Sequence, residues 1–119
     1  MKKNSQYTWI AVNEFIKTEE GKLTLGKLDR LSRQLLQWIV VRCQSDELLH
    51  IQEIIAHSEV ASPATVHKCI DVLRRAKLIS VEADKSDQRR RVVTPTRLGI
   101  TELRALDKAF ESWVRKPNF

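Results

Sequence analysis

The sequence contains few of the residues that mark several common classes of protein. Among its 119 residues are two cysteines, three glycines and three prolines. No run of about 18 apolar residues is present, as a membrane-spanning helix would require, and we find no secretory signal. These absences favour a protein of the reducing cytoplasm with no role in a membrane. Because Cys43 and Cys69 fall on apolar helix faces, both are interpreted as small buried hydrophobes, and a disulfide between them stays an alternative.

Motifs of catalysis and metal binding are also missing. The three histidines, His50, His57 and His67, show no HExxH spacing and no CxxC motif accompanies them. No nucleophile elbow, phosphate-binding loop or paired-acid motif surrounds the serines and carboxylates. We therefore expect no enzyme activity, no cofactor and no metal site.

Positive charge is in excess and is unevenly distributed along the chain. Charged residues make up 30% of the chain and apolar residues 42%, which is typical of a soluble, helix-rich globular domain. The net charge is +6, and residues 62–97 hold nine cations against four anions, so this segment alone carries +5. An excess of positive charge indicates a polyanionic partner. By itself it does not distinguish binding to nucleic acid, binding to a membrane surface and a simple contribution to solubility.

Residues 62–77 form the clearest predicted helix. Ser62 is a suitable N-cap and Pro63 suits the first helical position, where its missing N–H costs nothing. Val66, Ile70 and Leu73 recur at helical spacing and predict a buried stripe. The outer face at the start of this helix is small or hydrogen-bonding, as a helix that enters a groove requires.

The segments before this helix complete a helix-turn-helix. A helix is predicted over residues 7–20, a connector follows, and Ser32 is expected to cap a helix that ends near residue 44. Leu48 and Leu49 suit a very short strand, and a short helix follows over residues 51–55. The connection 57–61 then leads into helix 62–77.

The segments after this helix predict a wing. Residues 79–84 alternate apolar and polar as a half-buried strand does, and residues 92–94 form a returning strand that ends at Pro95. The polar residues 84–91 would form the hairpin tip, and Thr96 would cap a last helix that ends near residue 115. The predicted fold is mainly α with a small β-hairpin, a winged helix-turn-helix with extra N- and C-terminal helices. We divide it into an N-terminal helical arm (1–31), a DNA-binding core (32–96) and a C-terminal helix (97–119).

Three consecutive arginines, Arg89 to Arg91, are the second strong signal. Guanidinium groups on a hairpin can hold phosphates or enter the narrow minor groove of A·T-rich duplex. A solvated loop of mixed charge is the alternative. The position directly after a helix-turn-helix favours the interpretation as a DNA contact.

These motifs together resemble the MarR family of bacterial winged-helix transcription regulators. The family pattern opens its recognition helix with Ser and Pro, and continues with an Asp-x-Arg wing and a Thr-x-x-Gly entry to the next helix. The matching residues are Ser62, Pro63, Thr65, Val66, Asp71, Leu73, Asp87, Arg89, Thr96 and Gly99. The resemblance covers about residues 32–99, and Pro95 departs from it, because the pattern has an apolar strand residue there.

The resemblance implies roles for individual residues. The side chains that would face the major groove are Ser62, Ala64, Thr65, His67 and Lys68. Arg89 would reach the minor groove, with Asp87 bracing the wing. Family members are usually homodimers held by their terminal helices, and many bind small aromatic effectors. This chain has short terminal arms, which leave less material to enclose an effector.

Our hypothesis is a sequence-specific protein that binds double-stranded DNA and regulates transcription. Helix 62–77 would read base edges, chiefly through His67 and Lys68, while phosphates or the minor groove would be held by Arg89, Arg90, Arg91 and Arg97. The alternative is a winged-helix module that docks a protein partner through the same face. Aromatic residues on the terminal helices, such as Trp9 and Phe110, fit either a core within one chain or contact with a second copy.

Overall fold

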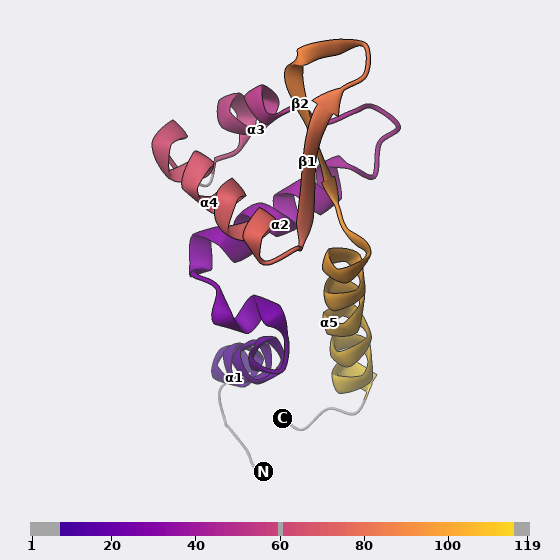
Figure 1. The fold of residues 1–119 in the computed structure, drawn as a ribbon. Coiled ribbons are helices and arrows are strands. Elements are labelled where there is room, and N and C mark those ends of the chain that lie inside the picture. The colour runs from indigo at the N-terminus through magenta and orange to yellow at the C-terminus, as the bar shows by residue number, and fades with distance from the viewer. Residues whose placement is uncertain (1–7, 60, 116–119) are drawn as a thin grey trace. The chain divides into compact units, whose positions relative to one another are not determined.

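The structure is a computed structural model that describes residues 8–59 and 61–115. Tyr7, the expected first residue of the first helix, and Val60, in the turn, lie outside this range, as do residues 1–6 of the predicted arm. The elements in chain order are α1 (Thr8–Gly21), the 3-10 helix η1 (Thr24–Lys27), α2 (Arg30–Arg42), α3 (Ile51–His57), α4 (Pro63–Arg75), β1 (Ile79–Asp84), β2 (Asp87–Pro95) and α5 (Arg97–Arg115) (Figure 1).

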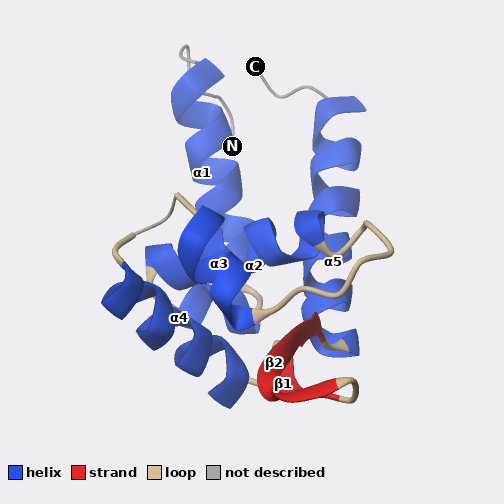
Figure 2. Cartoon of the chain, turned by 90° about the horizontal axis from the view of Figure 1, so that it is seen from above, coloured by secondary structure: helices blue, strands red, loops and turns tan. Residues whose placement is uncertain are grey.

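The described residues are mainly helical, with a single antiparallel hairpin formed by β1 and β2 (Figure 2). This confirms the predicted fold class. The chain divides into two compact units, one from Leu28 to Thr101 and one that joins the residues up to Lys27 to those from Glu102 onward. We call the first the winged unit and the second the terminal unit.

The winged unit is built around α2. This helix packs against α4 and β2, while α3 also contacts α4 and β2, and α4 contacts β1. The buried side chains come from every one of these elements because each contributes one apolar stripe or face. They include Leu35, Leu36, Ile39, Ile54, Val66, Ile70, Leu73, Ile79 and Val93.

α4 has well-formed ends. Ser62 is its N-cap, and its side chain accepts a hydrogen bond from the Thr65 N–H, as predicted. At the other end Lys77 adopts the left-handed conformation, with φ of 65°. The Leu78 N–H donates to the carbonyl of Leu73 over 3.0 Å, which is the Schellman closure of a helix. The helix therefore has a fixed direction at both ends.

The N-terminus of α2 differs from the prediction. Asp29, not Ser32, is the N-cap, and its carboxylate accepts from both the N–H and the hydroxyl of Ser32, at 3.1 and 2.7 Å. The hydrogen bond from the Ser32 hydroxyl is the main reason why the pKa of Asp29 is lowered. A carboxylate is favoured here because it also faces the positive end of the helix dipole.

A junction between the end of α4 and the start of α5 explains the Thr-x-x-Gly motif. The Thr96 hydroxyl accepts from the Gly99 N–H and donates to the carbonyl of Lys77, at 3.1 and 2.7 Å. The Thr96 N–H donates to the carbonyl of Leu78. A Cβ atom on Gly99 would lie 2.4 Å from that same carbonyl oxygen, so only glycine fits without a shift.

The terminal unit has its own contacts. The Glu102 side chain is buried, and its two carboxylate oxygens accept from the N–H groups of Thr24 and Leu25, at 3.0 and 3.1 Å. Phe15 of α1 stacks on Trp113 of α5 with ring centroids 4.9 Å apart. Phe110 packs edge-on against Phe15 at 5.9 Å. Three of the terminal aromatic rings therefore form a cluster within one chain.

Candidate nucleic-acid interface

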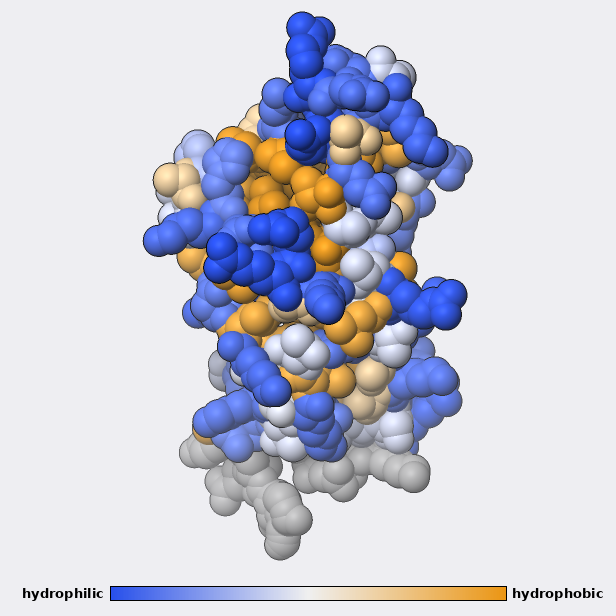
Figure 3. All heavy atoms as spheres, in the orientation of Figure 1, coloured by the Kyte–Doolittle hydropathy of each residue, from blue (hydrophilic) through white to orange (hydrophobic). Residues whose placement is uncertain are grey.

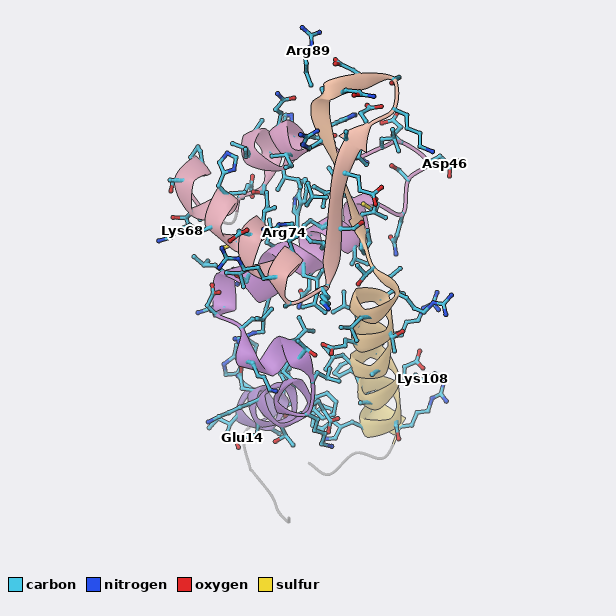
Figure 4. The ribbon with its side chains drawn as sticks, viewed as in Figure 1. Glu14, Asp46, Lys68, Arg74, Arg89 and Lys108 are labelled. Carbon is cyan, nitrogen blue, oxygen red and sulfur yellow. The ribbon has the colours of Figure 1, made fainter. Side chains whose placement is uncertain are left out.

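The outer face at the start of α4 is largely exposed. Ser62, Ala64, His67 and Lys68 are exposed, and Thr65 is half-buried. The opposite face is buried, which fixes the rotation of the helix and leaves these five side chains outside the core. Figure 4 shows Lys68 pointing outward from α4.

The last turn of α4 is less basic than its sequence suggests. Asp71 pairs with Arg74 at 2.7 Å and with Arg75 at 3.0 Å. One carboxylate therefore offsets part of the charge of two guanidinium groups. Both ion pairs are largely exposed and contribute little to stability.

The hairpin differs from the prediction in the length of its second strand. We expected a loop over residues 84–91, but β2 begins at Asp87, so the turn consists of Lys85 and Ser86 and the arginines lie on the strand. The sequence does not predict the first half of β2, because arginine has no strong preference for strands. The predicted end of β2 at Pro95 is confirmed.

A bulge presents two of the arginines. Pairing is regular from Ile79 opposite Pro95 to Ala83 opposite Arg91, but Asp84 then lies opposite Asp87 instead of Arg90. The intervening residues of β2, Gln88 to Arg90, have no partner on β1. A bulge of this kind bends a strand and redirects its side chains.

All three arginines are exposed. The side chain of Arg89 is 92% exposed, and its Nε lies 3.3 Å from Oδ1 of Asp87, so Asp87 pairs with a wing arginine. Figure 4 shows Arg89 projecting from the hairpin, and the same end of the molecule is covered by hydrophilic residues in Figure 3. Arg97, at the start of α5, is exposed as well.

The hairpin is attached to the segment before α3. The Val93 N–H donates to the carbonyl of Leu49 over 2.8 Å, and His50 forms an isolated β-bridge with Val92. The predicted short strand at Leu48 and Leu49 is thus reduced to a single bridge, one residue further on. His50 is also the N-cap residue of α3, so one residue joins the first helix of the helix-turn-helix to the wing.

A buried pair reinforces this attachment and was missed by sequence reasoning. His50 Nε2 lies 2.7 Å from Oδ2 of Asp84, with the side chains 11% and 7% exposed. The hydrogen bond from His50 is the main cause that lowers the pKa of Asp84 to about 2, with further hydrogen bonds from Ser86. No local signal could reveal this pair, because its members lie 34 residues apart.

The structure brings every predicted DNA-contacting residue into one compact unit. Their shared property is complete or partial exposure, and they come from the start of α4, from β2 and from the start of α5. Both cysteines are free. Among residues 8–59 and 61–115 no three His, Cys, Asp or Glu side chains come together as a metal ion would require. The helices in this part of the chain are all too short or too polar to span a bilayer.

Solved structures of other proteins share this fold, whereas no family model and no curated protein matches the sequence. The S. aureus MepR-DNA complex aligns over 93% of this chain and 88% of that chain, with a TM-score of 0.71 and 20% identity. For S. aureus MepR bound to ethidium bromide the coverage is 94% and 80%, the TM-score 0.68 and the identity 23%. A Bacillus cereus protein described as a MarR-like transcription regulator aligns over 91% and 72%, with a TM-score of 0.60 and 12% identity.

Proposed function

We propose that this chain, which has the winged-helix fold of MarR-like transcription regulators, binds double-stranded DNA in a sequence-specific manner and regulates transcription without catalysing a reaction. One observation carries the proposal. A hydrogen-bonding helix face and a bulged strand with exposed arginines occur in a single compact unit, on a fold that the MepR-DNA complex shares. As a regulator encoded by a bacterium or by a mobile element, the protein would act in the cytoplasm.

The start of α4 suits the reading of bases. The major groove admits an α-helix, and each base pair presents a distinct pattern of donors and acceptors there. The small side chain of Ala64 leaves room for α4 to approach the bases closely. His67 and Lys68 are exposed and carry N–H groups that can donate hydrogen bonds to acceptors on a base edge. We therefore assign specificity to this end of α4.

The wing suits the duplex backbone. Arg89, Arg90 and Arg91 are exposed, and fixed cations of this kind supply affinity that does not depend on sequence. Arg97 adds a further cation at the start of α5. We propose that these four residues contact phosphates or a narrow minor groove.

Selection of bound fragments from a random duplex pool tests the specific version of this proposal. We expect His67→Ala or Lys68→Ala to change the preferred sequence, with a cost of about 1–3 kcal/mol at the base pair that the side chain reads. Lys108→Ala, which removes an exposed cation of α5 (Figure 4), serves as the control and should leave the preferred sequence unchanged.

Two outcomes would contradict the proposal in different ways. Equal binding of every duplex by the wild type would remove sequence specificity and leave a DNA-coating protein. A gel shift with random duplex at low salt that shows no binding at micromolar protein would favour the alternative, a winged-helix module that docks a protein partner.

We further propose that the active form is a homodimer held by the terminal unit. Large apolar side chains are exposed on α1 and α5. Trp9 is 76% exposed and lies outside the cluster that Phe15 forms with Phe110 and Trp113 within one chain. Exposed apolar groups of this kind mark surfaces that bind another molecule. The exposed members are Trp9, Ile10, Ile16, Phe110 and Val114.

Sedimentation equilibrium tests the dimer. We expect the wild type to be dimeric at tens of micromolar, and Trp9→Ser combined with Val114→Ser to shift it toward monomer. Val41→Ser is the matched control, because Val41 is 66% exposed on α2 of the winged unit. A wild type that sediments as a monomer would refute the dimer. A small-molecule effector stays outside the proposal.

A further inference from the structure

Asp84 is a buried carboxylate whose hydrogen bonds hold the turn of the hairpin. Its Oδ1 accepts from both the N–H and the hydroxyl of Ser86, each at 2.9 Å, and Oδ2 faces His50 Nε2 at 2.7 Å. An ionised carboxylate only accepts hydrogen bonds, and a pKa of about 2 keeps Asp84 ionised at neutral pH. His50 Nε2 must therefore carry a hydrogen and donate it.

The place of Asp84 in the hairpin gives these bonds a consequence beyond stability. Asp84 is the residue at which the pairing register changes, directly opposite the start of the bulge that contains Arg89 and Arg90. Its partner His50 stands at the start of α3 and bridges to Val92 of β2. The pair thus joins the residue opposite the start of the bulge to the start of α3 in the helix-turn-helix.

Resting on the proposed function, we infer that His50 and Asp84 are positioning residues for DNA binding. They hold the bulge so that Arg89 and Arg90 are presented in a fixed relation to α4, and they act without contacting nucleic acid, since Asp84 is buried and the His50 side chain is only 11% exposed. A wing that is fixed before binding loses less conformational freedom when it meets the duplex. Breaking the pair should therefore weaken binding through the arginines.

A pair of substitutions at residue 50 separates the hydrogen bond from packing. His50→Gln keeps an N–H donor near the position of Nε2. His50→Leu removes this donor and introduces an apolar side chain of moderate size. We expect His50→Leu to weaken duplex binding about tenfold and His50→Gln to stay within about threefold of the wild type. In a background that lacks both arginines, Arg89→Ala with Arg90→Ala, His50→Leu should cost less than about twofold, since the residues that it positions are gone.

A measurement without DNA reports on the wing itself. Amide hydrogen exchange of Ser86 should accelerate in His50→Leu and stay slow in His50→Gln, while the amide of Ile70 in α4 keeps its protection in both. Where His50→Leu does not fold, Asp84→Ala replaces it, because alanine removes the acceptor of all three hydrogen bonds. This variant should show the same loss of Ser86 protection and of affinity.

The outcomes are distinguishable. A wild type that binds no duplex would overturn the proposed function and this inference with it. A wild type that binds, together with a His50→Leu variant that binds equally well, would overturn the inference alone. The inference would also fail if His50→Leu cost as much without the two arginines as with them, because the pair would then act independently of the wing.

Discussion

Replacing Arg89, Arg90 and Arg91 together by alanine is expected to lower the affinity for duplex DNA about a hundredfold near physiological salt. The three side chains are exposed on β2, so their removal deletes cations without opening the core. Each lost phosphate contact should also reduce the slope of log affinity against log salt by about 0.9, and the triple variant by about 2 to 3. Fluorescence anisotropy with a labelled duplex over a salt series measures both quantities.

The control for this experiment removes an equal charge elsewhere. Arg104, Lys108 and Arg115 are exposed on α5, in the part of the helix that belongs to the terminal unit. Their replacement by alanine changes the net charge by the same amount, and we expect less than about a threefold loss of affinity. Equal losses in the two triple variants would mean that net charge, not the wing, governs binding.

Gly99→Ala is expected to destabilise the protein by about 2 kcal/mol. The new Cβ would lie 2.4 Å from the carbonyl oxygen of Leu78, a backbone atom that the Thr96 N–H already holds. Alanine favours a helix over glycine by up to about 1 kcal/mol, but this gain is smaller at the first turn and does not offset the overlap. Urea unfolding followed by tryptophan fluorescence gives the free energy of unfolding.

Gly21→Ala is the matched control. Gly21 ends α1, has no atom within 4 Å of the position that a Cβ would occupy, and does not have a positive φ. We expect it to be neutral or to stabilise by less than about 1 kcal/mol. If Gly99→Ala were equally harmless, the junction between α4 and α5 would be able to open at no cost, and the contact with Leu78 would not explain the glycine.

The sequence was most informative where one segment specifies its own structure. Ser62, Pro63 and the stripe that includes Val66 predicted both the start of α4 and its buried face, because a cap and a helical period depend on residues a few positions apart. The alternation in residues 79–84 predicted the strand β1 itself, but not its burial throughout, since Ala83 is exposed and Asp84 is buried. The exposure of the predicted contact residues on α4 follows from its buried face, whereas the exposure of the arginines on β2 does not, and all contacts with DNA stay predictions.

The features that sequence reasoning missed depend on competition or on distant partners. Ser32 is an acceptable cap, yet Asp29 three residues earlier outcompetes it and takes the Ser32 hydroxyl as a donor. The bulge in β2 depends on how Asp84 is held, and that depends on His50, which no periodicity connects to it. Folding alone brings such residues together.

The bulged strand also has a consequence for the association of one copy with another. An exposed strand edge offers unpaired N–H and C=O groups to any similar edge, and proteins commonly guard such edges with charge or irregular geometry. Here Gln88 to Arg90 leave the ladder and carry two cations outward, so two hairpins that approach edge to edge would meet like charge and a bent backbone. The wing arginines should therefore keep the protein from aggregating through its hairpin, and the triple alanine variant should be more prone to aggregation than the α5 control.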